Sequence, residues 1–135
     1  KSDDAGVTVD SVANYAALTW PFVGGGAAVV TGVQAGYLVV EFNGTIEEWT
    51  LLADQSGTFT AKIERTTYSS FPAGWTEVSV STNRPALTTA QKANSSSLGG
   101  WTPSVTNGDI FRFEVTGTGS VEDVTLSMQL LKTGN

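Results

Sequence analysis

Residues 57–65 read Gly-Thr-Phe-Thr-Ala-Lys-Ile-Glu-Arg, and their side chains alternate between apolar and polar. Phe59, Ala61 and Ile63 take every second position, with threonines and charged residues between them. Successive side chains of an extended strand point to opposite faces of a sheet. The stretch therefore predicts a half-buried β-strand whose apolar face lies against a core.

Similar short apolar runs recur along the chain, separated by Gly, Asn, Asp and Pro. The predicted strands cover residues 37–42, 45–52, 57–65, 75–81, 109–115 and 124–130. No window keeps an apolar period of about 3.6 residues, although residues 86–94, inside the polar connection 82–100, allow a helical turn or two. Strands with one apolar face each predict an all-β protein, an antiparallel β-sandwich of jelly-roll type.

Turn signals divide these strands. Asn43-Gly44 predicts a hairpin after the first strand. Residues 53–57, Ala-Asp-Gln-Ser-Gly, predict a second hairpin reversal, because Asp can bond the backbone two residues on and Gly tolerates a positive φ. Gly24-Gly25-Gly26 predicts a flexible joint. We therefore expect a leading segment, 1–26, that acts as a linker or shaft connection, and a sandwich domain, 27–135.

Composition excludes several chemistries. The 135 residues include neither Cys nor His, so disulfides, thiol nucleophiles, Ser-His-Asp triads and zinc sites with thiolate or imidazole ligands are excluded. A net charge of −6 disfavours nucleic acid as a partner. No run approaches the roughly 18 apolar residues of a membrane helix, so membrane insertion is not expected. No cofactor is predicted.

The carboxylates do not predict an active site. Glu47-Glu48 and Glu122-Asp123 are adjacent pairs, whose side chains point to opposite faces within a strand. A glycosidase needs two carboxylates roughly 5 to 10 Å apart across one cleft. We read both pairs as surface charge and predict no catalytic residue, while a pair assembled from distant carboxylates stays open. The aspartates form no dense calcium-binding loop, so no metal site is predicted.

A series of short motifs adds a resemblance. In chain order they are Gly36-Tyr37-Leu38, Phe42-Asn43-Gly44-Thr45-Ile46, residues 49–57 (Trp-Thr-Leu-Leu-Ala-Asp-Gln-Ser-Gly), Thr67-Tyr68, Phe71-Pro72, residues 84–92, Leu98-Gly99-Gly100-Trp101, Gly108-Asp109, Phe111-Arg112-Phe113 and a terminal Val-Thr-Leu strand. With these motifs, residues 28–135 resemble the C-terminal module of bacteriophage tail-fibre and related virion appendage proteins. One departure is the strand after residues 53–57, where that family carries an acidic residue and a tryptophan. Here the strand reads Lys62-Ile63-Glu64-Arg65, so a ligand held on that face would differ.

The resemblance implies a virion protein, in a tail fibre or a capsid appendage, that assembles as a homotrimer. Its implied partners are host cell-surface polysaccharide or lipopolysaccharide, and other virion proteins through the N-terminus. The resemblance implies no catalytic residue. A purely structural module that trimerises and caps a fibre or decorates a capsid is the first alternative, and a polysaccharide depolymerase is the second.

Sugar-binding sites combine an aromatic face with polar groups that bond hydroxyls. Tyr68 and Trp75 flank a loop, and Asn83 and Arg84 follow shortly after. We therefore predict that these four residues bind glycan. The alternative is that Tyr68 plugs the end of the sandwich and that Trp75 begins a core strand.

Four apolar residues, Val39, Leu51, Ile110 and Leu131, fall opposite the predicted core side of their strands. A sheet with apolar residues on both faces often buries one face against a partner. We expect these side chains to lie in the trimer interface, the alternative being scattered exposed apolar residues.

Overall fold

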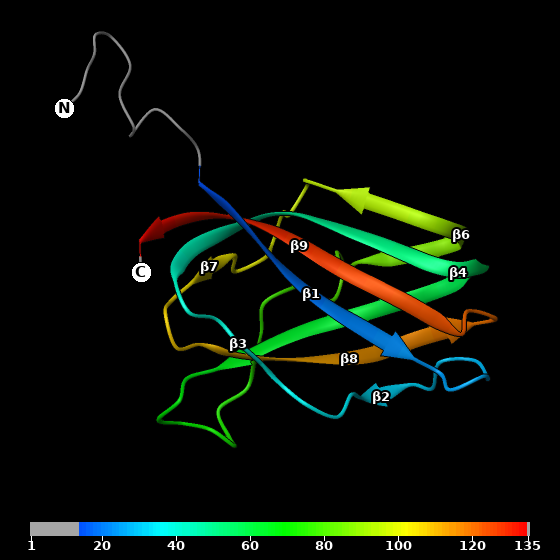
Figure 1. The fold of residues 1–135 in the computed structure, drawn as a ribbon, viewed down its shortest axis with the longest axis horizontal. Coiled ribbons are helices and arrows are strands. Elements are labelled where there is room, and N and C mark those ends of the chain that lie inside the picture. The colour runs from blue at the N-terminus through cyan, green and yellow to red at the C-terminus, as the bar shows by residue number, and fades with distance from the viewer. Residues whose placement is uncertain (1–13, 135) are drawn as a thin grey trace, which may run out of the picture.

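The computed structural model describes residues 14–134, which form nine strands and no helix (Figure 1). The strands are β1 (Tyr15–Val23), β2 (Gly32–Val33), β3 (Leu38–Val39), β4 (Asn43–Thr66), β5 (Thr76–Glu77), β6 (Ala86–Ser95), β7 (Ser104–Val105), β8 (Ile110–Gly119) and β9 (Asp123–Gly134). All pairings are antiparallel. The sheet order is β1-β9-β4-β8-β2, with β3 on β8, and with β5, β6 and β7 on β4. The predicted all-β, antiparallel class is confirmed, and the strands form one curled sheet.

The curl comes from β4, a single strand of 24 residues. Its first part, 43–53, pairs with β9, and its last part, 58–66, pairs with β8. β6 pairs with both parts, with register shifts between residues 52 and 59, and such irregularities bend a strand. Figure 1 shows β4 and β6 bending together, so that the two parts of β4 run in opposite directions. The chain does turn at 53–57, but the predicted hairpin is wrong because the two parts pair with other strands.

The curled sheet encloses one hydrophobic core. Rings on β1 meet rings on the opposite part of the sheet. Trp20 stacks on Phe113 with centroids 5.1 Å apart, and Phe22 meets Phe59 edge-on at 5.0 Å. Because β1 pairs with β9 and not with β4 or β8, these contacts join two facing surfaces. Burial of each such ring contributes about 1.5–3 kcal/mol.

The alternation that predicted the main strands is confirmed. The residues predicted to face inward are at most 1% exposed: Phe59, Ala61, Ile63, Phe111, Phe113, Val115, Val124, Leu126, Met128 and Leu130. Leu51 and Ile110 were predicted on the outer side and are buried instead. An irregularity between Ile46 and Glu48 shifts the alternation of β4, which brings Leu51 to the core side with Trp49. Ile110 is paired on both sides, with Val39 of β3 and with Thr66 of β4.

Residues 82–100 are not one long connection, because β6 occupies half of them. The helical turn allowed for residues 86–94 is wrong. One residue of β6, Leu87, is buried, so the strand shows no apolar alternation. Backbone pairing with β4 holds it in place.

The predicted hairpin at Asn43-Gly44 is also wrong. Residues 37–42 contain the two-residue β3, which pairs with β8, and the predicted strand at 75–81 shortens to β5. Gly44 lies inside β4, where a Cβ atom would meet the carbonyl oxygen of Leu131 at 2.7 Å. Glycine at this position permits close approach of β9 rather than a turn.

The structure does not place a domain boundary after Gly26, because part of the expected leading segment belongs to the sheet. β1 pairs with β9 over nine residues, from Tyr15 with Leu131 to Val23 with Asp123. Leu18 and Phe22 of this strand are buried in the core. Residues 15–23 therefore belong to the sheet, and residues 1–13 of the expected linker lie outside the described residues.

Candidate functional site

Three aromatic side chains from two separate segments form one cluster. Tyr37 precedes β3, while Phe71 and Trp75 lie in the loop between β4 and β5. The Tyr37 ring meets Phe71 edge-on with centroids 4.9 Å apart and lies nearly parallel to Trp75, at 5.9 Å and 11°. The Phe71 and Trp75 centroids are 6.1 Å apart. Rings at such separations attract one another beyond their burial. We call Tyr37, Phe71 and Trp75 the aromatic platform.

Backbone contacts hold the loop that carries two of these rings. The amide of Phe71 donates to the carbonyl of Thr67 at 2.9 Å, which closes a turn at the start of the loop. Gly74 has a φ of +79°, a conformation that favours glycine. The indole N–H of Trp75 donates to the carbonyl of Pro72 at 2.9 Å. The loop therefore fixes the direction of the Trp75 ring.

Trp75 is covered and Tyr37 is open. The guanidinium carbon of Arg112, on β8, lies 4.4 Å from the centroid of the Trp75 ring, a cation–π contact of about 0.5–1 kcal/mol at such a site. Together with the stacked Tyr37 ring, it leaves Trp75 half-buried. Tyr37 itself is 52% exposed. Within the platform, Trp75 serves as a support and Tyr37 presents a surface to solvent.

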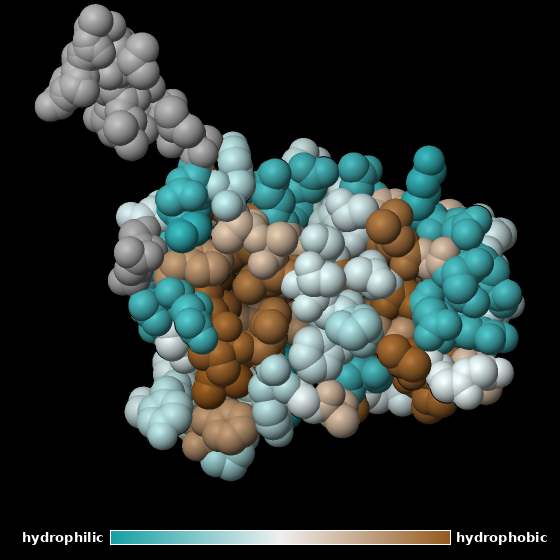
Figure 2. Space-filling model, in the orientation of Figure 1, coloured by the Kyte–Doolittle hydropathy of each residue, from teal (hydrophilic) through white to brown (hydrophobic). Residues whose placement is uncertain are grey.

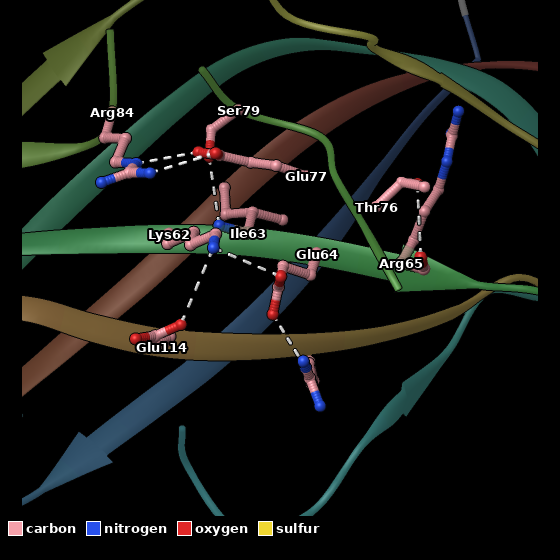
Figure 3. Close-up of polar contacts among 10 residues, drawn as sticks. Lys62, Ile63, Glu64, Arg65, Thr76, Glu77, Ser79, Arg84 and Glu114 are labelled. Atoms are coloured by element: carbon pink, nitrogen blue, oxygen red, sulfur yellow. Dashed lines mark hydrogen bonds and ion pairs between the residues drawn. The ribbon is translucent and has the colours of Figure 1, made fainter. Parts of the chain in front are cut away.

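A ladder of opposite charges lies beside the platform on β4 and β8. Glu64, which is 7% exposed, accepts a hydrogen bond from Nε of Arg112 at 2.8 Å. Nζ of Lys62 lies 3.4 Å from Glu64 and 4.0 Å from Glu114, and Figure 3 shows Lys62 between these two carboxylates. Arg112 therefore holds both the Trp75 ring and a buried carboxylate.

Arg84, predicted to bind glycan, is held by Glu77 of β5. Nε and Nη2 of Arg84 donate to the two carboxylate oxygens of Glu77 at 2.8 and 3.0 Å (Figure 3). This bond lowers the pKa of Glu77 and raises that of Arg84. Ser79 also donates to Glu77 at 2.7 Å and accepts the amide of Ile63 at 3.1 Å. Through its bond to Ile63, Ser79 ties the segment after β5 to β4.

Asn83, also predicted to bind glycan, is engaged in hydrogen bonds with the segment after β6. Its amide donates to the carbonyls of Ser97 and Gly99 at 3.0 and 3.1 Å. The backbone carbonyl of Asn83 accepts a hydrogen bond from the indole N–H of Trp101 at 2.6 Å. These bonds tie the segment that follows β6 to the segment that precedes it.

The structure brings two of the four predicted residues into one loop. Tyr68 and Trp75 share the loop between β4 and β5, and Tyr68 is 83% exposed. Asn83 and Arg84 lie beyond β5, where Asn83 bonds Ser97 and Gly99 and Arg84 bonds Glu77. Tyr37 and Arg112 were missed as site residues, because the sequence marks one as the start of a strand and the other as an outward charge.

A polar hollow of about 210 Å³ adjoins the same loop. Its lining residues are Arg65, Thr66, Thr67, Ser70, Gly74, Thr76 and Asp109. Nη1 of Arg65 lies 3.8 Å from a carboxylate oxygen of Asp109. Hydroxyl groups and a paired charge suit a polar, uncharged ligand better than an apolar one.

Two polar residues of the bend at 53–57, Asp54 and Gln55, have structural partners. Oδ1 of Asp54 accepts the backbone amides of Glu122 and Asp123, both at 3.0 Å, and these bonds lower the pKa of Asp54. The side-chain amide of Gln55 donates to the carbonyl of Ser120. Both residues therefore hold the connection between β8 and β9 against β4.

The described residues offer no group of three or more acidic, His or Cys side chains able to hold a metal ion. Glu48 accepts a hydrogen bond from the Asn94 amide at 3.2 Å, and Glu47 is exposed.

The chain matches no family model, and no curated protein matches it in sequence.

Across residues 14–134 there is no helix long and apolar enough to cross a membrane.

Proposed function

We propose that this chain is a non-enzymatic attachment module of a bacteriophage virion that binds host cell-surface glycan. In this proposal it stands at the tip of a tail fibre or on a capsid appendage, and three copies form a homotrimer. Each copy is a jelly-roll sandwich, which the bent β4–β6 pair supports because its two strands run through both parts of the curled sheet.

The aromatic platform is the observation that carries this proposal. Sugar rings stack their C–H faces on aromatic rings, while hydroxyls bond nearby polar groups. Tyr37 offers a half-exposed ring, stacked on Trp75 and therefore fixed in direction. A fixed ring loses little conformational freedom when it binds. Three such sites in a trimer would multiply weak single-site binding.

The carboxylates beside the platform favour binding over hydrolysis. A glycosidase needs one carboxyl group that keeps its proton near neutral pH. Glu64 lies between Arg112 and Lys62, and Arg84 lowers the pKa of Glu77. Arg84 therefore favours the ionised form of Glu77, which is the opposite of what a general acid requires.

A glycan array tests the proposal, with the whole chain as the probe and Tyr37→Ala as the variant. We expect binding to fall by at least about fivefold, since loss of a stacking ring costs about 1–3 kcal/mol. Tyr15→Ala is the matched control, because Tyr15 is 53% exposed and lies outside the platform. Absence of glycan binding by the folded protein, or equal loss in both variants, would contradict the proposal.

The second candidate function is a structural module that trimerises and caps a fibre or decorates a capsid. Exposed apolar side chains favour it, and most of the large ones fall in the first strands and their connections: Tyr15, Val23, Val30, Val33, Tyr37 and Val39. Figure 2 shows hydrophobic surface in two areas of one face, with side chains of mostly intermediate hydropathy between them. Of the residues expected in a trimer interface, Val39 is 52% exposed and Leu131 is partly buried.

The mass in solution tests the trimer in both candidates. We expect light scattering to give the molar mass of three chains of 14.1 kDa each. Val33→Asp and Val39→Asp would each shift the protein toward single chains. A single chain at high concentration would remove the trimer from both candidates, and a trimer that binds no glycan would favour the structural one.

A further inference from the structure

The cations beside the aromatic platform are all paired with carboxylates. The cations are Lys62, Arg84 and Arg112, and the carboxylates are Glu64, Glu77 and Glu114. The two signs are equal in number: Arg112 and Glu114 of β8 lie opposite Glu64 and Lys62 of β4, and Glu77 of β5 is bonded by Arg84. This surface therefore offers an incoming ligand no excess of positive charge.

An anionic ligand would have to compete for a cation that is already engaged. Arg112 is the cation closest to the rings, and its Nε is bonded to Glu64 at 2.8 Å. Moving Arg112 onto a ligand carboxylate or phosphate would weaken the pairing of a nearly buried carboxylate. Leaving a buried charge without its partner is strongly unfavourable. The net charge of −6 adds repulsion at longer range.

A neutral sugar meets none of these costs. Its C–H face packs on the exposed ring of Tyr37, and that contact displaces no ion pair. The hydroxyl groups of Thr67 and Ser70, in the adjoining hollow, suit the same class of ligand.

We propose that the aromatic platform binds neutral hexopyranose units and discriminates against acidic ones, an inference that rests on the glycan-binding function proposed above. Host-surface polysaccharide built from neutral sugars would be its ligand, in preference to chains rich in uronic acid, sialic acid or phosphate.

The test is an array that carries neutral hexose oligosaccharides beside uronic-acid and sialic-acid oligosaccharides. We expect binding to neutral probes that changes less than about twofold between about 50 and 300 mM NaCl, because no net charge is neutralised. We expect binding to acidic probes to be at least about tenfold weaker. Tyr37→Phe keeps the ring and should retain neutral binding, whereas Tyr37→Ala should lose it.

The outcomes separate the two proposals. If the folded protein binds no oligosaccharide, the glycan-binding function fails and this inference fails with it. If it binds acidic probes more tightly than neutral ones, with affinity that falls as salt rises, the function stands and the neutral preference is overturned.

Glu114→Gln gives a second test that leaves the rings in place. It removes one negative charge from the ladder, so binding to acidic probes should rise by about two- to fivefold at low salt, with neutral binding unchanged. Glu47→Gln changes the net charge equally on the part of β4 that pairs with β9, and should change neither. An equal rise in both variants, or a rise in neither, would contradict a local charge balance.

Discussion

The bend at 53–57 and the loop between β4 and β5 both interrupt regular alternation, and they differ in what their side chains contact. In the bend, Asp54 and Gln55 bond the backbone of the β8–β9 connection. In the loop, backbone bonds hold the chain, while the Tyr37 ring beside it stays half-exposed. The polar residues of the bend therefore have a structural role, and the aromatic surface is the part left open to a ligand.

The largest expected effect is at the bend, in Gly57→Ala. A Cβ atom there would lie 2.3 Å from the carbonyl oxygen of Gly119, so β4 and β8 would have to move apart. We expect a loss of about 3 kcal/mol in the free energy of unfolding, measured by urea denaturation. Gly99→Ala is the control, because a Cβ there meets nothing within 4 Å. Equal stability of the two variants would contradict the close approach.

Trp75→Ala should have the next largest effect, and it acts on the loop. The variant loses the contacts with Tyr37, Phe71 and Arg112 and the bond to Pro72. We expect about 2 kcal/mol of destabilisation, together with loss of glycan binding because the Tyr37 ring loses its support. Full binding by a correctly folded Trp75→Ala protein would show that Tyr37 needs no stacking partner.

Asp54→Asn tests the bend through pH. Two backbone amides lower the pKa of Asp54 below its ordinary value of 3.8, so the charged form stabilises the fold above that pH. This contribution is lost as the pH falls through the lowered pKa of the folded state. The stability difference between wild type and Asp54→Asn should be largest near neutral pH and shrink below about pH 4. A stability difference that stays constant down to pH 2 would contradict this role of the Asp54 carboxylate. Glycan binding should be the same in both proteins.

Tyr68→Ala should have the smallest effect on stability, within about 0.5 kcal/mol, because its side chain is 83% exposed. Its effect on glycan binding decides how far the site extends along the loop. We expect a smaller loss than in Tyr37→Ala, since a ring not fixed by neighbours contributes less. A larger loss would move the centre of the site from Tyr37 to Tyr68.

The core was predictable from sequence where strands alternate. Phe59, Ala61 and Ile63 are all fully buried, as their spacing predicts. β6 was not predictable in this way, because one of its ten residues is buried and its place depends on backbone pairing with β4. Without β6, residues 53–57 read as a hairpin, since nothing in the sequence shows that a second strand follows them through the bend.

The candidate site was predictable in part. Tyr68 and Trp75 were found because they flank one loop, which is a local signal. Tyr37, just before β3, and Arg112 of β8 both reach Trp75, a juxtaposition set by strand pairing between distant segments. Arg84 is drawn to Glu77 instead of a ligand, and sequence spacing does not reveal that preference.

β4 pairs directly with β5, β6, β7, β8 and β9, and this has a consequence for cooperativity. Amide hydrogens exchange with solvent through whichever opening needs the least free energy. An opening that frees the amides of β4 must separate strands in both parts of the sheet at once. The paired amides of β4 on both sides of the bend should therefore exchange at a common slow rate set by global unfolding. Such a strand makes the molecule open as a whole rather than in pieces.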